Sequence, residues 1–367
     1  MLVLDDGWFG KRNSDTSGLG DWFVNENKLK GGLSMLADKI NDLGMKLGIW
    51  FEPEMVSEDS HLYRAHPDWA IAIPDRKPMR GRFQLVLDMS RREVQDYLFS
   101  AISNILDNAN ISYIKWDMNR SISDLYSHAL PAERQGELSH RYALGLYSLL
   151  ERLIQKYPNV LFEGCSGGGG RFDAGMLYYT PQIWCSDNSD AIDRLRIQYG
   201  TSFGYPVSAM GAHVSAVPNH QTGRITPLHT RGVVAMSGTF GYELDLLKLT
   251  EEEKDEVRSQ IGEFRKYAPL IQNGRYYRLT DPFKSEVCAW EIVGNSQEEV
   301  LLNVVMEEIH GNMTVNYVQL RGLDESALYK EQTTGRIYSG AALMHGGMPL
   351  PAEFGEYRAY QYHFVRE

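Results

Sequence analysis

The stretch ISYIKWDMNR, residues 111–120, decides the fold. Its first half is apolar and β-branched, as expected for a buried strand. Its second half brings together the charged and polar side chains of Lys115, Asp117, Asn119 and Arg120. Because side chains alternate along a strand, Tyr113, Lys115 and Asp117 share one face. A buried strand that ends in charge is typical of a parallel barrel, in which the chemistry lies at the carboxyl ends of the strands.

Outward from this stretch, short apolar runs alternate with segments of helical periodicity. The predicted strands are residues 2–5, 45–51, 83–88, 111–117, 159–165, 182–187, 206–213 and 239–245. The predicted helices are residues 33–43, 91–109, 137–157, 191–203, 226–238 and 250–271, the last with Thr250 as its N-cap. Eight strands with crossovers predict an α/β fold, a (β/α)8 TIM barrel.

The pattern of polar and apolar residues changes after residue 271. The remainder has short segments of alternating polarity, such as SEVCAWEIV (285–293) and EEVLLNVVME (298–307), and no helical period. We therefore expect two domains. Residues 1–272 form the catalytic barrel, and residues 275–367 form a small antiparallel C-terminal β-sandwich domain.

Composition is that of an ordinary globular protein. Of the 367 residues 43% are hydrophobic and 23% are charged, and the net charge of −11 disfavours nucleic acid and membrane surfaces as partners. Three cysteines, an odd number, argue for a reducing compartment rather than a disulfide framework. The N-terminus lacks the features of a signal peptide, and no stretch reaches the roughly 18 apolar residues of a membrane span. We expect a cytoplasmic location.

Most of the other predicted strands also end in acidic side chains. These are Asp5, Asp6, Glu52, Glu54, Asp88, Glu163, Asp187, Glu243 and Asp245. Such a ring of carboxylates, with tryptophans beside it, suits sugar chemistry, because aromatic rings pack on a pyranose and carboxylates accept hydrogen bonds from its hydroxyls. Two carboxylates can also cleave a glycosidic bond. Binding of a divalent metal is the competing interpretation, since hard cations take oxygen ligands.

Several of these features have plainer explanations. An isolated Asp at a strand end is most often a turn or helix cap, and this is the expectation for Asp88. Glu52 and Glu54 flank Pro53 and either support the loop or act in the site. The run SGGGG (166–170) lacks the patterns of a phosphate cradle and suits close approach of the backbone to a ligand.

Five motifs stand in order along the chain. They are DDGWFG (5–10), WFEPEMV (50–56), KWDMNR (115–120), EGCSGGGGRFD (163–173) and WCSDNSDA (184–191). Together they resemble the motifs of the α-galactosidases of glycoside hydrolase family 36, and the likeness runs over essentially the whole chain. It implies retaining, exo-acting hydrolysis of terminal α-linked galactose from α-galactoside oligosaccharides of the melibiose, raffinose and stachyose type, with no cofactor and no metal.

The resemblance also implies roles for individual residues. Asp117 matches the nucleophile, and Asp187 matches the general acid/base. Asp5 and Asp6 match the pair that holds the O4 and O6 hydroxyls of the sugar and so selects galactose over glucose. Further sugar contacts are matched by Trp50, Arg82, Lys115, Asn119, Cys165 and Gly168.

These roles set physical requirements. A retaining enzyme needs two carboxyl groups about 5–5.5 Å apart. Asp117 must be ionised to attack the anomeric carbon, and Lys115 on the same face would stabilise that charge. Asp187 must start protonated so that it can give a proton to the leaving oxygen, and it can then act as a base.

The chain departs from the family at its N-terminus. Family members usually begin with a large β-sandwich domain, whereas Met1 here lies inside the first expected barrel strand, which is truncated to LVLD (2–5). A short first strand exposes a sheet edge, so a homo-oligomer is compatible with the sequence. Two alternatives stay open. One is a raffinose-type galactosyltransferase with the same residues, and the other is a catalytically weak galactoside-binding fragment.

Overall fold

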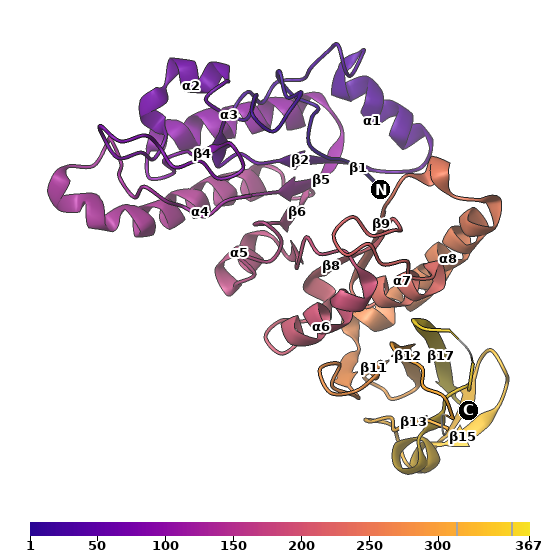
Figure 1. Cartoon of the computed structure of the whole chain (residues 1–367). Helices are drawn as coiled ribbons and strands as arrows, with labels where there is room; N and C mark the ends of the chain where they lie inside the picture. The colour runs from indigo at the N-terminus through magenta and orange to yellow at the C-terminus, as the bar shows by residue number, and fades with distance from the viewer. Residues whose placement is uncertain (313–314, 354) are drawn as a thin grey trace. The chain divides into compact units, whose positions relative to one another are not determined.

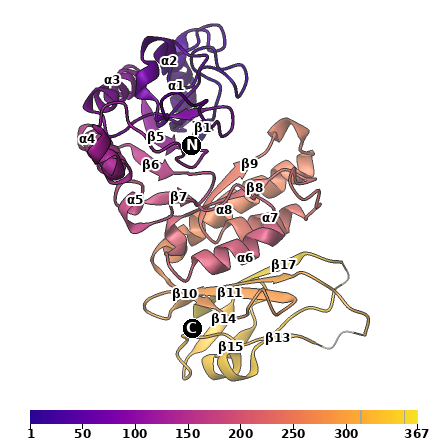
Figure 2. The same cartoon turned by 60° about the vertical axis from the view of Figure 1, so that its left-hand side comes forward.

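The structure is a computed structural model that describes residues 1–312, 315–353 and 355–367. Contacts between residues divide the chain into two compact units, Met1–Trp184 and Cys185–Glu367. Figures 1 and 2 show the helices and strands of each unit. Within the described ranges, every helix is too short or too polar to cross a membrane.

The first unit is built on a parallel sheet with the strand order β1-β2-β5-β6-β7. Its strands are β1 (Leu2–Leu4), β2 (Leu47–Phe51), β5 (Ile111–Trp116), β6 (Leu161–Gly164) and β7 (Gln182–Trp184). The register places Trp50 beside Lys115 and Lys115 beside Glu163. Three polar or aromatic side chains from neighbouring strands therefore stand at one level of the sheet.

The helices of the first unit agree in part with the periodicity of the sequence. They are α1 (Gly32–Asp42), α2 (His61–Ala65), α3 (Arg92–Asn108), α4 (Leu138–Lys156) and α5 (Ala174–Tyr179), with short 3-10 turns at Pro67–Trp69 and Ala132–Glu137. Of these helices, α1, α3 and α4 were predicted from the periodicity, and α2 and α5 were not. Apolar side chains of α1, α3 and α4 form one core with those of β2, β5 and β6. Burial of these faces is the main force that holds the unit together.

The two faces of β5 differ in the way that alternation requires. Ile114 and Trp116 are fully buried in the core with the helices. Lys115, between them in sequence, points to the opposite face and is part-exposed. Asp117 follows the strand, and its backbone N–H donates to the carbonyl of Phe51 at 2.8 Å, which extends the β2–β5 pairing by one residue.

The predicted strand 83–88 differs from the others. Only Leu85–Val86 (β4) is a strand, and it pairs antiparallel with Met55–Val56 (β3), outside the parallel sheet. The chain enters it through Arg82 and Phe83, which both have positive φ angles (46° and 62°). The apolar run is buried, but this left-handed entry turns it away from the direction that a parallel strand requires.

The second unit begins with helices around a pair of parallel strands. β8 (Met210–Ser215) pairs in parallel with β9 (Thr239–Glu243). The helices are α6 (Ala191–Thr201), α7 (Leu228–Ala235) and α8 (Glu251–Asn273), with 3-10 turns at Val207–Ala209 and Leu246–Lys248. The N-cap prediction for α8 is confirmed: the Thr250 hydroxyl accepts from the Glu253 N–H while the Glu253 carboxylate accepts from the Thr250 N–H.

The rest of the second unit is antiparallel. A six-stranded sheet has the order β10-β11-β12-β17-β14-β15, and β13 pairs with β16. The bounds are β10 (Arg275–Arg278), β11 (Val287–Val293), β12 (Glu299–Met306), β13 (Tyr317–Val318), β14 (Leu328–Glu331), β15 (Ile337–Ser339), β16 (Met348–Pro349) and β17 (Arg358–Arg366), with a π-helical turn at Ala342–Gly346. The prediction of an antiparallel C-terminal β-domain is confirmed, and its boundary at residues 272–275 stays a prediction.

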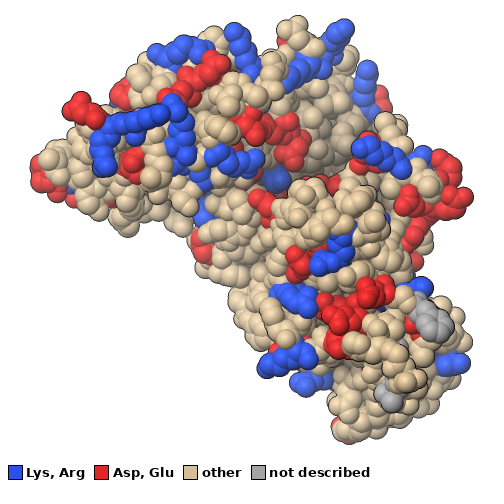
Figure 3. All heavy atoms as spheres, in the orientation of Figure 1, with Lys and Arg blue, Asp and Glu red and all other residues tan. Residues whose placement is uncertain are grey.

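Charged side chains of both signs lie on the face that Figure 3 presents, with Lys and Arg among Asp and Glu. The three cysteines, Cys165, Cys185 and Cys288, are buried, and within the described residues none of them forms a disulfide.

Candidate active site

Asp117 lies at the carboxyl end of β5, and its side chain is 5% exposed. Its carboxylate accepts three hydrogen bonds, from the Trp50 indole Nε1 (3.1 Å), the Met118 backbone N (2.8 Å) and the Asn119 side-chain Nδ2 (2.7 Å). Trp50 and Asn119 both donate to Oδ2, while Met118 donates to Oδ1. Donors on both oxygens fix the plane of the carboxylate.

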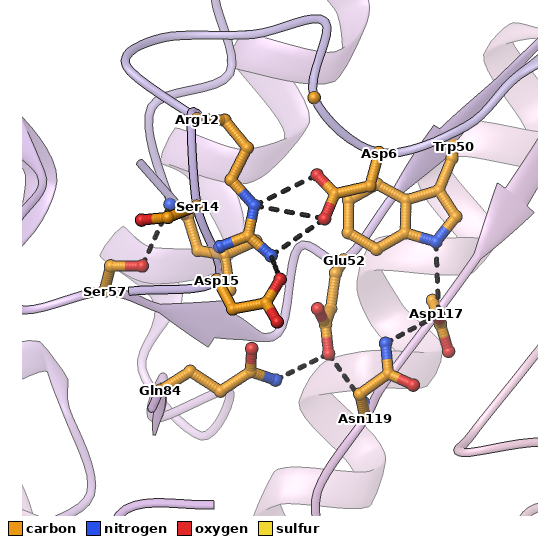
Figure 4. A network of polar contacts seen from close by, with 12 residues as sticks. Asp6, Arg12, Ser14, Asp15, Trp50, Glu52, Ser57, Gln84, Asp117 and Asn119 are labelled. Carbon is orange, nitrogen blue, oxygen red and sulfur yellow. Dashed lines mark hydrogen bonds and ion pairs between the residues drawn. The ribbon is translucent and has the colours of Figure 1, made fainter. Parts of the chain in front are cut away.

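Glu52 continues this network just past the end of β2, as Figure 4 shows. Its Oε1 accepts from the Asn119 backbone N (2.6 Å) and from Gln84 Nε2 (2.6 Å). Burial and the negative charge of Asp117 raise the pKa of Glu52 from 4.5 to about 7, and the hydrogen bonds from Asn119 and Gln84 only partly offset this. Glu52 therefore titrates near neutral pH beside Asp117.

Lys115 lies on the inner face of β5 with two neighbours at ion-pair and cation–π distance. Its Nζ is 3.8 Å from Asp5 Oδ2 and 5.9 Å from the centre of the Trp184 ring. Burial favours the neutral amine, but the negative charge of Asp5 and of other nearby groups outweighs it, so the pKa of Lys115 lies above its ordinary value. Lys115 thus keeps its positive charge between Asp5 and Asp117.

Asp6 is bound by Arg12, a residue that lies outside the five sequence motifs. The Arg12 guanidinium donates to Asp6 through Nε (3.0 and 3.1 Å) and NH2 (2.8 Å), and its NH1 donates to the Ser17 carbonyl at 3.1 Å. Arg12 is 5% exposed, whereas Asp6 is 34% exposed. A planar guanidinium that grips both carboxylate oxygens fixes the orientation of Asp6.

Glu54 has a different environment, although it is only two residues from Glu52. It is fully buried and pairs with the Arg171 guanidinium (2.9 and 3.1 Å). It also accepts from the Trp116 indole (2.8 Å) and the Tyr142 hydroxyl (2.6 Å). Because Arg171 follows the glycine-rich run, Glu54 ties that loop to the end of β5 and to α4.

The glycine-rich loop carries two of the predicted sugar contacts. Cys165 is 3% exposed, and its backbone N donates to the Trp116 carbonyl at 2.8 Å. Gly168 has a φ of +82° and accepts from the Ser166 N–H at 2.7 Å. A tight turn with positive φ explains a glycine at 168. Arg82 is exposed in the loop that leads to β4.

Asp187 belongs to the second unit and is exposed in the loop between β7 and α6. Arg194 holds this loop, because its side chain donates to the carbonyls of Ser186 (2.8 Å) and Asn188 (2.8 Å) on either side of Asp187. Gln221 Nε2 donates to the Asp187 carbonyl at 3.2 Å. Hydrogen bonds to three consecutive backbone carbonyls, those of residues 186–188, thus hold the loop at Asp187 in place.

Six of the nine predicted site residues of the first unit fall into three groups. Asp117, Trp50 and Asn119 are joined by hydrogen bonds; Asp5 and Lys115 form a second group; and Asp6 is bound by Arg12. The expectation that Asp88 is a turn or cap residue is confirmed as a turn, because its Oδ1 accepts from the Ser90 N–H at 3.0 Å, whereas the N-cap of α3 is Arg91. Sequence reasoning missed Arg12, Gln84 and Arg171 as supports of the site. Arg171 lies within the motif EGCSGGGGRFD (163–173), whereas Arg12 and Gln84 lie outside the five motifs.

One exposed group elsewhere could hold a metal ion. Within the part of the chain that the structure describes, ligand atoms of Glu286, Glu308 and His310 lie within 4.8 Å of one another. These residues belong to the C-terminal β-domain and include none of the predicted site residues. Exposed acidic groups of this kind are common without an ion.

Comparison with known proteins adds independent findings. Residues 1–274 match the Melibiase family, and residues 287–364 match the Glycosyl hydrolase family 36 C-terminal domain. The chain is 60% identical over 365 residues to the bifunctional α-galactosidase/sucrose kinase AgaSK of Mediterraneibacter gnavus, covering 100% of this chain and 38% of that protein. It is 53% identical over 351 residues to α-galactosidase AgaA of Geobacillus stearothermophilus, covering 96% and 48%.

Solved structures agree. The crystal structure of AgaA superposes with a TM-score of 0.98 at 51% identity and covers 100% of this chain and 51% of that one. Variants of AgaA have been solved in complex with raffinose and with stachyose. The predicted fold, a TIM-type barrel followed by an antiparallel C-terminal β-domain, is therefore confirmed.

The chain spans about half the length of AgaA, which it covers to 48%, and less of AgaSK, which it covers to 38%. The matched ranges nevertheless take in all ten predicted site residues, since the last of these in sequence is Asp187 and the first match extends to residue 274. Over these ranges, this chain belongs to the Melibiase family and carries the C-terminal domain of glycosyl hydrolase family 36.

Proposed function

We propose that this chain carries the chemistry of a retaining exo-α-galactosidase. Asp117 is the nucleophile and Asp187 is the general acid/base. The substrates are α-galactoside oligosaccharides of the melibiose, raffinose and stachyose type, and the enzyme releases their terminal galactose. The observation that carries the proposal is the buried carboxylate of Asp117, oriented by three donors at the end of a barrel strand.

In the first step, Asp187 gives its proton to the glycosidic oxygen while an Asp117 oxygen attacks the anomeric carbon. The bond to the leaving sugar breaks, and a covalent galactosyl ester forms on Asp117. In the second step, Asp187 takes a proton from water, and that water displaces Asp117 with a second inversion. The two inversions together retain the configuration at the anomeric carbon.

Recognition of the galactose ring falls to the remaining predicted residues. Asp5 and Asp6 accept hydrogen bonds from the O4 and O6 hydroxyls, and Lys115 supplies positive charge beside Asp5 and Asp117. Trp50 offers its ring while its indole N–H is used by Asp117. The other proposed contacts are Arg82, Asn119, Cys165 and Gly168.

Three findings support this proposal. Relatives above 50% identity are named as α-galactosidases. AgaA variants bind raffinose and stachyose. Three hydrogen-bond donors orient the buried carboxylate of Asp117 at the end of a barrel strand. The buried cysteines, none of which forms a disulfide among the described residues, agree with the further proposal of a cytoplasmic location.

The test is hydrolysis of p-nitrophenyl α-D-galactoside by the 367-residue chain, with the α-glucoside as the comparison. We expect turnover of the galactoside only, and NMR of the first-formed sugar should show the α-anomer. Asp117→Ala should lower turnover by roughly 10⁴-fold or more, as loss of a nucleophile does. Added azide should restore part of it as β-galactosyl azide.

Asp187→Ala separates the two carboxylates. We expect its first step to be slow on raffinose, which needs a proton for its leaving oxygen, and much less affected on p-nitrophenyl galactoside, whose leaving group needs little help. A chain that binds galactose by calorimetry but turns over neither substrate would contradict the hydrolase proposal and leave the galactoside-binding alternative.

A further inference from the structure

The feature that carries a further inference is a line of hydrogen bonds that ends on Asp117. Gln84 Nε2 donates to Glu52 Oε1, which also accepts from the Asn119 backbone N–H, both at 2.6 Å. The Asn119 side chain then donates to Asp117 Oδ2 at 2.7 Å. Figure 4 shows these four residues together, with Trp50 donating to Asp117 from another direction.

A glutamate at position 52 is energetically unfavourable, because its carboxyl group is buried beside another carboxylate. It is 1% exposed, and the donors to it are neutral amides, whereas the neighbouring charge that acts on it is the negative one of Asp117. A buried carboxyl without a cation destabilises the fold, and a glutamine of the same shape would avoid that penalty. Glu54, by contrast, has Arg171 as its cation. What position 52 supplies to the site is an acceptor oxygen for the Asn119 backbone N–H.

We propose that Glu52 is a positioning residue for the nucleophile: it holds the backbone of Asn119 so that the Asn119 amide stays on Asp117 Oδ2. The proposal rests on the proposed role of Asp117. Glu52 does not touch the substrate. Its effect passes through Asn119, which together with Trp50 fixes one oxygen of Asp117 and so directs the carboxylate plane at the anomeric carbon.

This role predicts a particular pattern of kinetics. Without the acceptor at position 52, the Asn119 segment is free to shift and the Asp117 carboxylate to rotate. A misplaced nucleophile loses rate, by about 100-fold for a shift of roughly 1 Å, while sugar binding elsewhere persists. The loss should therefore fall on kcat and leave KM close to its original value.

The experiment compares Glu52→Ala and Glu52→Gln in the full 367-residue chain, with p-nitrophenyl α-D-galactoside as substrate and thermal unfolding as the measure of folded protein. The Ala variant should lose about 100-fold in kcat per folded molecule. The Gln variant should stay within about fivefold of the original, because its amide oxygen still accepts from the Asn119 N–H.

Glu291→Gln is the matched control. Glu291 on β11 is also fully buried, and it also accepts a backbone N–H, from Arg321 at 2.6 Å. It lies in the C-terminal sheet, outside the candidate site, so the same chemical change there should leave kcat and KM unchanged.

Two kinetic results would overturn the proposal. Unchanged kcat per folded molecule in Glu52→Ala, with only a lower unfolding temperature, would make Glu52 a residue of the fold. A raised KM with unchanged kcat would make it a direct sugar contact.

A second measurement decides the proposal if the original chain shows no turnover, a result that would count against the proposed function itself. With 15N-asparagine labelling, hydrogen exchange of the Asn119 backbone N–H can be followed without any substrate. We expect fast exchange in Glu52→Ala and slow exchange in Glu52→Gln. Equal, slow exchange in both variants would show that Glu52 does not hold Asn119 and would overturn the inference.

Discussion

Two regions meet at Pro53, and each contains one buried glutamate. On one side Glu54 is paired with the cation Arg171 and also accepts hydrogen bonds from Trp116 and Tyr142. On the other side Glu52 accepts from amides only and lies in the field of Asp117, which raises its pKa to about 7.

The segment around Pro53 therefore has two roles, one structural and one in the candidate site. The Glu54 region joins three parts of the first unit, namely the glycine-rich loop, the end of β5 and α4. The Glu52 region joins the candidate nucleophile to its orienting amide. A carboxylate with a cation holds structure, and a carboxylate without one is retained where its acceptor or its charge serves the chemistry.

We expect the largest effect on stability from Glu54→Gln, which tests the structural role of Glu54. Removing one partner of a buried ion pair leaves Arg171 buried and unpaired, so we expect a loss of about 3–5 kcal/mol in the free energy of unfolding. Urea unfolding measures this. The exposed Glu137, which pairs with Arg134 and Arg141, offers a matched control, and Glu137→Gln should change stability little. Equal effects at the two positions would mean that Glu54 is not the structural member of the pair.

A second, smaller effect concerns the pH dependence of stability. The pKa of Glu52 is raised in the fold from 4.5 to about 7, so the folded protein binds this proton more tightly than the unfolded chain does. The contribution of Glu52 is therefore neutral below about pH 4.5 and becomes unfavourable as the pH rises to about 7, by at most about 3 kcal/mol.

Glu52→Gln should remove this penalty. We expect the variant to gain stability relative to the original chain, with a gain that grows from about pH 5 and levels off above about pH 7. Urea unfolding of both proteins across that range gives the difference. A difference that does not change with pH would show that Glu52 binds its proton equally well in the folded and the unfolded chain, and it would remove the contrast between the two regions.

We expect the smallest effect at a third carboxylate, Asp6, which extends the comparison to a residue that is proposed to bind the sugar. Asp6, like Glu54, is gripped by a guanidinium, but it is part-exposed and is proposed to bind the sugar. Arg12→Lys loses the two-pronged contact, and we expect KM for the galactoside to rise about tenfold with little change in kcat. Arg64→Lys, at the exposed pair with Asp59, is the control. A fall in kcat alone would place Arg12 with Glu52 rather than with the sugar-binding groups.

Much of the fold was predictable, because burial imposes a period on the sequence. The longer helices of the barrel region were predicted to within a few residues, since their apolar stripes are long, and α8 also carries a capping box. The short helices α2 and α5 were not predicted, because five or six residues are too few to show a helical period. The segment 83–88 was predicted as a parallel strand and is not one. Its apolar run is as buried as that of a strand, and the positive φ angles of Arg82 and Phe83 that redirect it leave no mark in its composition.

The sequence by itself determined the order of strands and helices, the family motifs and the identity of the residues at the strand ends, because all of these depend on local period and spacing. Only the tertiary structure decided what each carboxylate does, because that depends on partners far along the chain. Arg171 lies 117 residues from Glu54, and Trp50 lies 67 residues from Asp117. The charge and hydrogen bonds that separate Glu52 from Glu54 come from such long-range neighbours, so two similar residues on either side of Pro53 acquire different chemistry.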